Sequence, residues 1–151
     1  MLQASLIEIF TRDLEKLKEE IGLYRDENAL WVTRGEIANS AGNLCLHLIG
    51  NLKHFIGATL GHSGYVRTRD LEFSQKNVPR SELLMALDST IDVVQSSLSR
   101  LSESDFWADF PLEKHGRVVS TDYMLLHLLT HLNYHLGQVN YHRRLLDAED
   151  F

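Results

Sequence analysis

The sequence predicts an all-α protein, a four-helix bundle whose helices are joined by long connections. In four segments the apolar residues recur at alternating steps of three and four, which is the period of an amphipathic α-helix. No segment has the strict alternation of a β-strand, and only two prolines, Pro79 and Pro111, interrupt the chain. Long amphipathic segments without strands are typical of helices packed around one core.

The first two predicted helices cover residues 2–24 and 39–61. The first has a regular apolar stripe, formed by Leu6, Phe10, Leu14, Leu17, Ile21 and Tyr24. Residues 25–38 break this period, so we expect a connection there. The second segment is apolar nearly all round, which indicates a helix packed on several sides. Its polar exceptions share one face: His47, Asn51 and His54.

The second half of the chain predicts two further helices. Residues 62–79 combine glycine, proline and mixed charge, and we expect a long irregular connection. Residues 80–101 again have the helical period. Residues 102–119 are expected to form a loop with a short strand or hairpin. The last helix is predicted over residues 120–147, with Ser120 as its N-cap. The order of the helices around the core stays open.

Composition limits the class of protein. At 151 residues, one domain covering residues 1–151 is expected. The 21 acidic residues outnumber the 15 Lys and Arg, and the basic residues do not gather on one face, which argues against nucleic acid or an anionic membrane as partner. The single cysteine, Cys45, excludes an internal disulfide and is expected to be a small buried apolar residue. No signal-like segment or 18-residue apolar run is visible, so we expect a cytoplasmic protein.

Histidines give the clearest functional signal. His127, His131, His135 and His142 lie in the last predicted helix, and the first three follow one another at steps of four. Residues four apart share one face of a helix, and chance would give roughly 0.02 such triplets in a chain of this composition. A single histidine on an apolar face is usually a hydrogen-bonded core residue. The repeated spacing instead favours a metal site.

Helix geometry limits which histidines can cooperate. His127 and His135 are separated by about 12 Å along the axis, so one ion can take a neighbouring pair but not all three. The third ligand must come from another helix, where His47 and His54 are the candidates. Three imidazoles without a carboxylate suit zinc or nickel, with iron as a further possibility, and they leave one coordination position open. Because no Glu-x-x-His pair faces the core, a dinuclear carboxylate site is not expected.

Other polar residues near these histidines have less certain roles. His54 and His127 could contact a metal ligand or a substrate, although packing or surface roles are favoured for both. Gln138 lies near His135 and could orient a ligand, and a hydrogen bond between helices is an equal alternative. The same two alternatives hold for Asn51, one turn beyond His47.

The connection 62–79 carries a group of charged residues: Arg67, Arg69, Asp70 and Glu72. Arginine suits carboxylate recognition, so this group could line the mouth of a pocket and bind an anionic or thiol-peptide substrate. A solvated loop or a dimer contact is the favoured interpretation.

Two motifs resemble a known family, the DinB/YfiT-like superfamily of small metal-binding four-helix bundles. The run His131-x-x-x-His135-Leu136-Gly137-Gln138 is similar to the family's His-x3-His-x-Gly-Gln signature, although Leu136 stands where the family often has a basic residue. His47, within LCLHLIGNLKHFIG, matches the histidine that the family contributes from its second helix. The resemblance implies His47, His131 and His135 as ligands of one divalent metal.

The resemblance also implies a range of functions. Characterised members are metal-dependent hydrolases and transferases that act with low-molecular-weight thiols, and members commonly form homodimers. The run from Tyr65 to Phe73 is similar to one in uncharacterised small members. We therefore expect a metal-dependent hydrolase or thiol transferase acting on a small thiol-type substrate. The competing expectation is a non-catalytic interaction or metal-sensing bundle.

Overall fold

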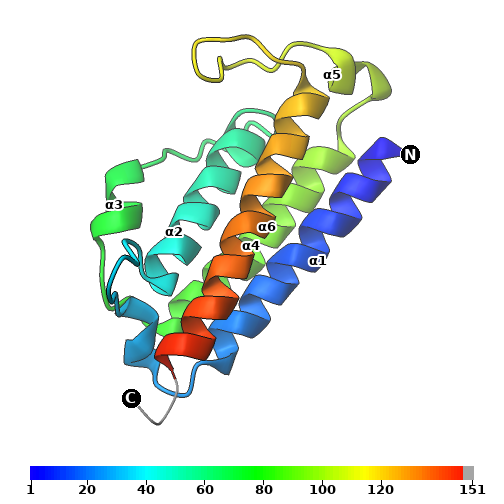
Figure 1. Ribbon diagram of the computed structural model, residues 1–151. Coiled ribbons are helices and arrows are strands. Elements are labelled where there is room, and N and C mark those ends of the chain that lie inside the picture. The colour runs from blue at the N-terminus through cyan, green and yellow to red at the C-terminus, as the bar shows by residue number, and fades with distance from the viewer. Residues whose placement is uncertain (148–151) are drawn as a thin grey trace.

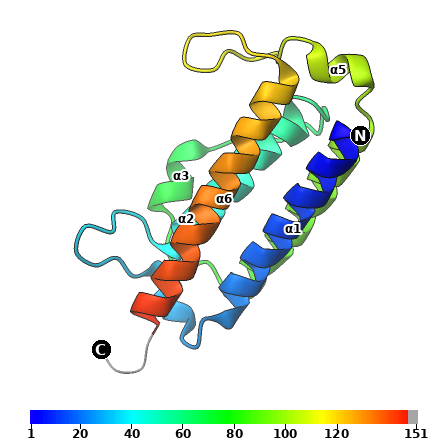
Figure 2. The same cartoon turned by 45° about the vertical axis from the view of Figure 1, so that its right-hand side comes forward.

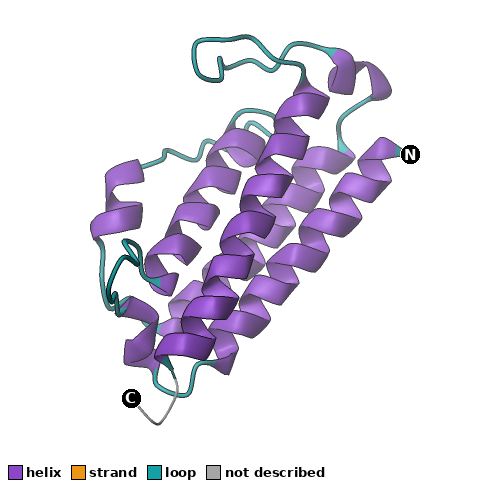
Figure 3. Ribbon diagram, viewed as in Figure 1, coloured by secondary structure: helices purple, strands orange, loops and turns teal. Residues whose placement is uncertain are grey.

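A computed structural model of the chain describes residues 1–147, and these residues form no β-strand (Figures 1 and 3). Four long helices lie side by side: α1 (Leu2–Leu23), α2 (Ala41–Leu52), α4 (Arg80–Ser99) and α6 (Thr121–Leu146). Two short helices, α3 (Arg69–Ser74) and α5 (Glu103–Trp107), lie in the connections. The all-α prediction is confirmed.

The long helices pack as a ring in the order α1, α4, α2, α6 and back to α1. Figure 1 shows that α2 and α4 run in the same direction, while α1 and α6 run in the opposite direction. The connection between α2 and α4 therefore returns along the whole length of the molecule, and α3 lies within it beside α2. This crossover places a loop segment against the face of α2 that carries the polar residues.

The apolar stripes predicted from the sequence form the core. On α1, the stripe residues Phe10, Leu14, Leu17 and Ile21 are completely buried. Their period of three and four places them on one side of the helix, where they meet α4 and α6. Cys45 is also fully buried in the core, and burial raises the pKa of its thiol to about 12. The thiol is therefore a packing group, as expected.

The second helix differs from the prediction at its end. The α-helical hydrogen bonds stop at Leu52, and Lys53–Ala58 forms a wider π-helical segment instead of continuing to residue 61. Gly57 and Gly61 lie where this segment packs on α4, and a Cβ atom at Gly57 would come within 2.7 Å of Val93. The apolar composition of residues 39–61 does not reveal this widening, because composition does not report whether the backbone bonds follow the α- or the π-helical pattern.

The connections contain more structure than predicted. Residues 27–31 form a 3₁₀ turn, α3 lies in the supposedly irregular segment 62–79, and α5 begins the segment 102–119. The expected short strand is absent from the described residues. Two isolated antiparallel bridges, Asp109 to Ser120 and Lys114 to Arg117, do pair the two sides of segment 102–119, as the expected hairpin would. Ser120 is the N-cap residue of α6, but its side chain makes no capping hydrogen bond. None of the helices within residues 1–147 combines the length and apolar character needed to cross a bilayer.

Candidate metal centre

Three histidines from two helices meet at one point. The Nε2 atom of His131 lies 3.2 Å from Nε2 of His47 and 3.1 Å from Nε2 of His135. His131 and His135 are one turn apart on α6, and His47 faces them from α2. One ligand atom from each ring lies within 4.8 Å of the others. The structure thus brings together the three residues singled out in the sequence, and they could hold a metal ion.

The hydrogen bonds of two rings fix where their lone pairs point. Nδ1 of His47 lies 3.0 Å from the carboxylate Oε1 of Glu72, and Nδ1 of His135 lies 2.7 Å from the carbonyl Oε1 of Gln138. Both partners are acceptors, so each Nδ1 carries the proton and donates it. Each neutral ring then has its lone pair on Nε2. Both lone pairs point toward Nε2 of His131.

A metal cation can bind all of the converging Nε2 atoms, whereas a single proton cannot. A neutral His131 has one proton, and on Nε2 it could serve only one of the two facing lone pairs. A cation accepts all three lone pairs together. Ligand nitrogens around a tetrahedral ion with bonds of 2.0–2.1 Å are roughly 3.3 Å apart, close to the two observed separations. The donor set and its spacing therefore fit a divalent ion of the zinc type.

The surroundings favour the neutral form of His47 and His131. Burial, and then the neighbouring charges of His135 and His47, lower the pKa of His131 to about 4. Burial also lowers the pKa of His47, although its hydrogen bond to Glu72 acts in the opposite direction. A neutral imidazole is the form that binds a metal, so His47 and His131 need not lose a proton near neutral pH.

Glu72 stands behind His47 as the residue that orients it. The Glu72 side chain is buried, and Arg67 donates to both of its oxygens, from Nε to Oε2 and from Nη2 to Oε1, each at 2.8 Å. Two parallel hydrogen bonds from one guanidinium are strong and directional, so they fix the orientation of the carboxylate. Carboxylate, histidine and metal in series form a frequent arrangement in metal sites, where the carboxylate fixes the ring and raises its basicity.

Two residues of α2 make room for this carboxylate and hold the segment that carries it. Asn43 is fully buried, and its Nδ2 donates to the backbone carbonyls of Glu72 and Gln75 at 3.0 and 2.8 Å. Gly50 allows the close approach, because a Cβ atom there would lie 1.9 Å from Oε2 of Glu72. The hydrogen bonds from Asn43 and the absence of a side chain at Gly50 hold α3 against α2.

Two expectations about this segment change accordingly. Arg67 and Glu72 were expected in a solvated loop or a dimer contact, but they are an internal ion pair that supports His47. None of the four charged residues lines the pocket beside His135 that is described below. Arg69 and Asp70 are exposed. The sequence analysis assigned no role to Gly50 or Asn43. The position of Gly50 inside a predicted helix was a signal that another group approaches the helix closely there.

The remaining candidates lie around the triad without joining it. The ring of His127 stacks 6.4 Å from that of His131, and His54 contacts Phe55 with ring centroids 4.7 Å apart. Burial lowers the pKa of both histidines. The Oδ1 atom of Asn51 is buried and, within the described chain, has no hydrogen-bond partner. Gln138 does have a partner, the Nδ1 atom of His135.

His142, which received no role from the sequence, is a structural residue. Its Nε2 donates to the carbonyl of Val32 at 2.7 Å, and its Nδ1 accepts from the hydroxyl of Tyr24 at 2.6 Å. The ring is buried and ties α6 to the connection after α1. It is separate from the triad.

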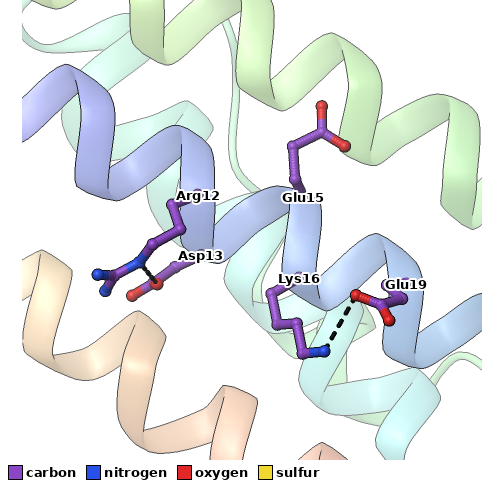
Figure 4. A pocket seen from close by; sticks show the side chains of 5 residues that line it. All are labelled: Arg12, Asp13, Glu15, Lys16 and Glu19. Carbon is purple, nitrogen blue, oxygen red and sulfur yellow. Dashed lines mark hydrogen bonds and ion pairs between the residues drawn. The ribbon is translucent and has the colours of Figure 1, made fainter.

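A pocket of about 660 Å³ borders the triad. His135 and Gln138 form part of its wall, together with residues from the connection 36–39, from α2 and from the C-terminal half of α6. A second hollow lies on the surface of α1, where Arg12 pairs with Asp13 and Lys16 with Glu19 (Figure 4). It contains no residue of the triad.

Comparison with known proteins identifies the family but no activity. No curated protein matches the sequence. The family described as "Protein of unknown function (DUF1572)" has a model that matches residues 5–151. That match includes the triad, the segment that carries Arg67 and Glu72, and all of α6. The chain therefore belongs to the DUF1572 family of proteins of unknown function.

Proposed function

We propose that this protein binds one divalent transition metal, zinc or nickel before iron, through His47, His131 and His135, and uses it as a metal-dependent hydrolase or low-molecular-weight-thiol transferase. The observation that carries the proposal is the convergence of the three Nε2 atoms, two of them with lone pairs fixed by hydrogen bonds at Nδ1.

Two features favour a catalytic over a structural site. Structural zinc sites usually have four protein ligands, whereas catalytic sites have three and one open position. Within residues 1–147, no fourth histidine, cysteine or carboxylate joins the triad. The pocket beside His135 gives a substrate access to that side of the triad. When bound, a divalent ion there would supply a Lewis acid that activates water or holds a thiol as its thiolate.

The protein's own residues have defined tasks in this proposal. Glu72 retains the Nδ1 proton of His47 in a hydrogen bond, so that Nε2 stays a donor to the metal. Gln138 does the same for His135. Arg67 holds the Glu72 carboxylate in place by donating to both of its oxygens. These contacts hold the ligands in place before any ion binds.

The proposed fold type and oligomeric state rest on the resemblance to the DinB/YfiT-like superfamily. We propose that the fold is a four-helix bundle of the DinB/YfiT-like type and that the protein forms a homodimer. The ring of four long helices and the His47, His131 and His135 set support the type. Sedimentation analysis of the purified protein tests the dimer.

Metal analysis tests the metal site. Protein purified without a histidine tag should contain about one equivalent of a divalent transition metal, and His131→Ala should lose it. His127→Ala is the matched control, since His127 lies one turn away on the same face of α6. Retention of metal by His131→Ala, or equal loss from both variants, would overturn the assignment.

Activity distinguishes catalysis from a non-catalytic or sensing role. Metal-loaded protein should conjugate or hydrolyse small thiol-type substrates, and His135→Ala should be inactive under the same conditions. Equal activity of wild type and His135→Ala would remove this residue from the catalytic site. Tight metal binding without turnover of any thiol or hydrolase substrate would favour the sensing module.

A further inference from the structure

The pocket beside the triad has a chemical character of its own. It lies between α6 and the connection 33–40, which loops outward beside α6 in Figure 2 (light blue). Tyr134, Tyr141 and Leu145 contribute its α6 wall, and Ile37 and Leu44 lie opposite. A volume of about 660 Å³ is in the range of pockets that bind small organic molecules.

Two exposed tyrosines make the wall aromatic. Tyr134 and Tyr141 are 64 % and 63 % exposed and lie seven residues apart, so they project from the same face of α6. Gly137, between them, would meet no atom within 4 Å if it carried a Cβ. The helix surface is therefore open between the two rings. Tyr134, and the face of Tyr141 that Arg144 does not cover, offer flat apolar surfaces to a ligand.

The pocket has little to offer an anion. Among the described residues that line it, Glu36 is the one with a formal charge, and there is no lysine or arginine. The arginine beside the triad, Arg67, is bound to both oxygens of Glu72. Arg144 stacks on Tyr141 but lines a different hollow with Lys16 and Glu20. A carboxylate placed among these lining residues would lose hydration without meeting a lysine or an arginine in the pocket wall.

We infer that this pocket holds the body of the substrate, and that the substrate is a small thiol with an apolar or aromatic body and no negative charge. The inference rests on the proposed function in one respect: the substrate's thiol is placed at the end of the pocket near His135, where it would reach the proposed metal. The inference adds the chemical class of the rest of the substrate, which would contact Tyr134, Tyr141 and Leu44.

Thiol binding to the cobalt-loaded protein tests the class directly. The sulfur-to-cobalt absorption band should report binding of three probes that share the same two-carbon thiol unit and differ in the group attached to it: 2-phenylethanethiol, cysteamine and 3-mercaptopropionate. We expect 2-phenylethanethiol to bind at least about tenfold more tightly than 3-mercaptopropionate. The phenyl ring of the first contacts the apolar wall, whereas the carboxylate of the second meets no lysine or arginine in the wall. Equal affinities, or a preference for 3-mercaptopropionate, would overturn the inference.

A matched pair of tyrosine variants locates the effect. Tyr141→Ala should reduce the preference for 2-phenylethanethiol by at least about threefold. Tyr123→Ala is the control, because Tyr123 is also an exposed tyrosine on α6 that an arginine covers, but it does not line the pocket. An equal effect of both variants, or none for Tyr141→Ala, would contradict the proposed position. Glu36→Gln should improve the binding of 3-mercaptopropionate relative to cysteamine.

Failure of the metal proposal can be told apart from failure of this one. If no cobalt binds, or no probe gives the absorption band, the proposed function fails. Saturation-transfer NMR with 2-phenylethanethiol on the metal-free protein then still tests the pocket, because its aromatic wall does not depend on the ion. Transfer that Tyr141→Ala removes and Tyr123→Ala retains would support the pocket, and absence of transfer would refute it.

Discussion

The carboxylate of Glu72 lies 3.0 Å from Nδ1 of His47, and this contact links the crossover connection to the histidine triad. Both side chains are buried, and the pair is closed on its outer side by Arg67. The position of His47, a candidate metal ligand on α2, therefore depends on Glu72, which lies 25 residues later in the chain. Variants of that segment should change metal binding without touching a ligand.

Glu72→Gln should weaken metal binding by about tenfold to a hundredfold, the usual cost of losing a carboxylate behind a ligand histidine. The neutral amide no longer raises the basicity of His47, and Arg67 loses its ionic partner. A competition titration against a chromophoric chelator measures the change. Asp70→Asn is the matched control, because Asp70 is exposed on the same short helix. Unchanged affinity in Glu72→Gln would show that the contact does not support the site.

Gly50→Ala tests the same relationship without changing the chemistry of Glu72. The added methyl group would overlap Oε2 of Glu72 at 1.9 Å, so the carboxylate must move away from His47. We expect weaker metal binding, although alanine is otherwise favoured over glycine in a helix by about 1 kcal/mol.

Gly22→Ala is the control for this substitution. Gly22 lies in α1, where an added Cβ atom would meet nothing within 4 Å. This variant should leave metal affinity unchanged and should not lower the midpoint of thermal unfolding. Equal metal affinity in Gly50→Ala and the wild type would mean that Glu72 can move without loss.

The sequence was sufficient for the long helices. Together with the family resemblance it also singled out the three histidines that the structure brings together, but it was insufficient for the residues that support them. The stripe from Leu6 to Tyr24 has a local period, and the spacing of His131 and His135 on one helix is also a local property. The pairing of His47 with Glu72 joins two segments 25 positions apart, and no periodicity reports such a contact. For the same reason α3, which is held by side-chain bonds from Asn43, was not predicted.

The pocket was also beyond prediction, because its two walls come from distant segments. Tyr134 and Tyr141 share a face of α6 in the sequence pattern, but the connection 36–39 lies opposite them only in the folded chain. A long connection has no fixed path that its composition reveals. The π-helical end of α2 escaped prediction because an apolar run without clear periodicity does not distinguish the two helix types.

His142→Gln should destabilise the protein by about 1–3 kcal/mol near pH 7.5, the cost of leaving the buried partners of His142 incompletely bonded. The affected groups are the Tyr24 hydroxyl and the Val32 carbonyl. Urea unfolding of the metal-free protein measures the free energy of unfolding.

The difference between the wild type and His142→Gln should shrink on acidification. Burial lowers the pKa of His142 in the folded chain below its ordinary value of 6.5. Above pH 6.5 the ring is neutral in both states, so it adds no pH dependence. Below pH 6.5 the unfolded chain takes up the proton first, which lowers the stability of the wild type. The glutamine variant lacks this loss. A difference that grows as the pH falls would contradict the assigned sign.

Arg143→Ala tests the polar contact between α1 and α6. Glu20 is buried, and it accepts from Nε of Arg143 and from Nδ2 of Asn140, each at 2.8 Å. Removing the arginine leaves a buried carboxylate with one neutral donor, so we expect a loss of about 2–3 kcal/mol in the free energy of unfolding at pH 7. Arg144→Ala is the matched control, since the adjacent arginine is exposed.

The pH dependence and a second substitution distinguish the lost ion pair from a general effect on α6. Burial alone would raise the pKa of Glu20, but the hydrogen bonds from Arg143 and Asn140 outweigh it and the pKa is lowered. The ion pair therefore stabilises the fold above the ordinary pKa of 4.5, and this contribution is lost as the pH falls through the lowered value. The cost of Arg143→Ala should shrink over that range. Adding Glu20→Gln should restore part of the stability at pH 7, because the buried charge is then absent. If the double variant is no more stable than Arg143→Ala, the cost lies in lost packing of the arginine stem and not in the unpaired carboxylate.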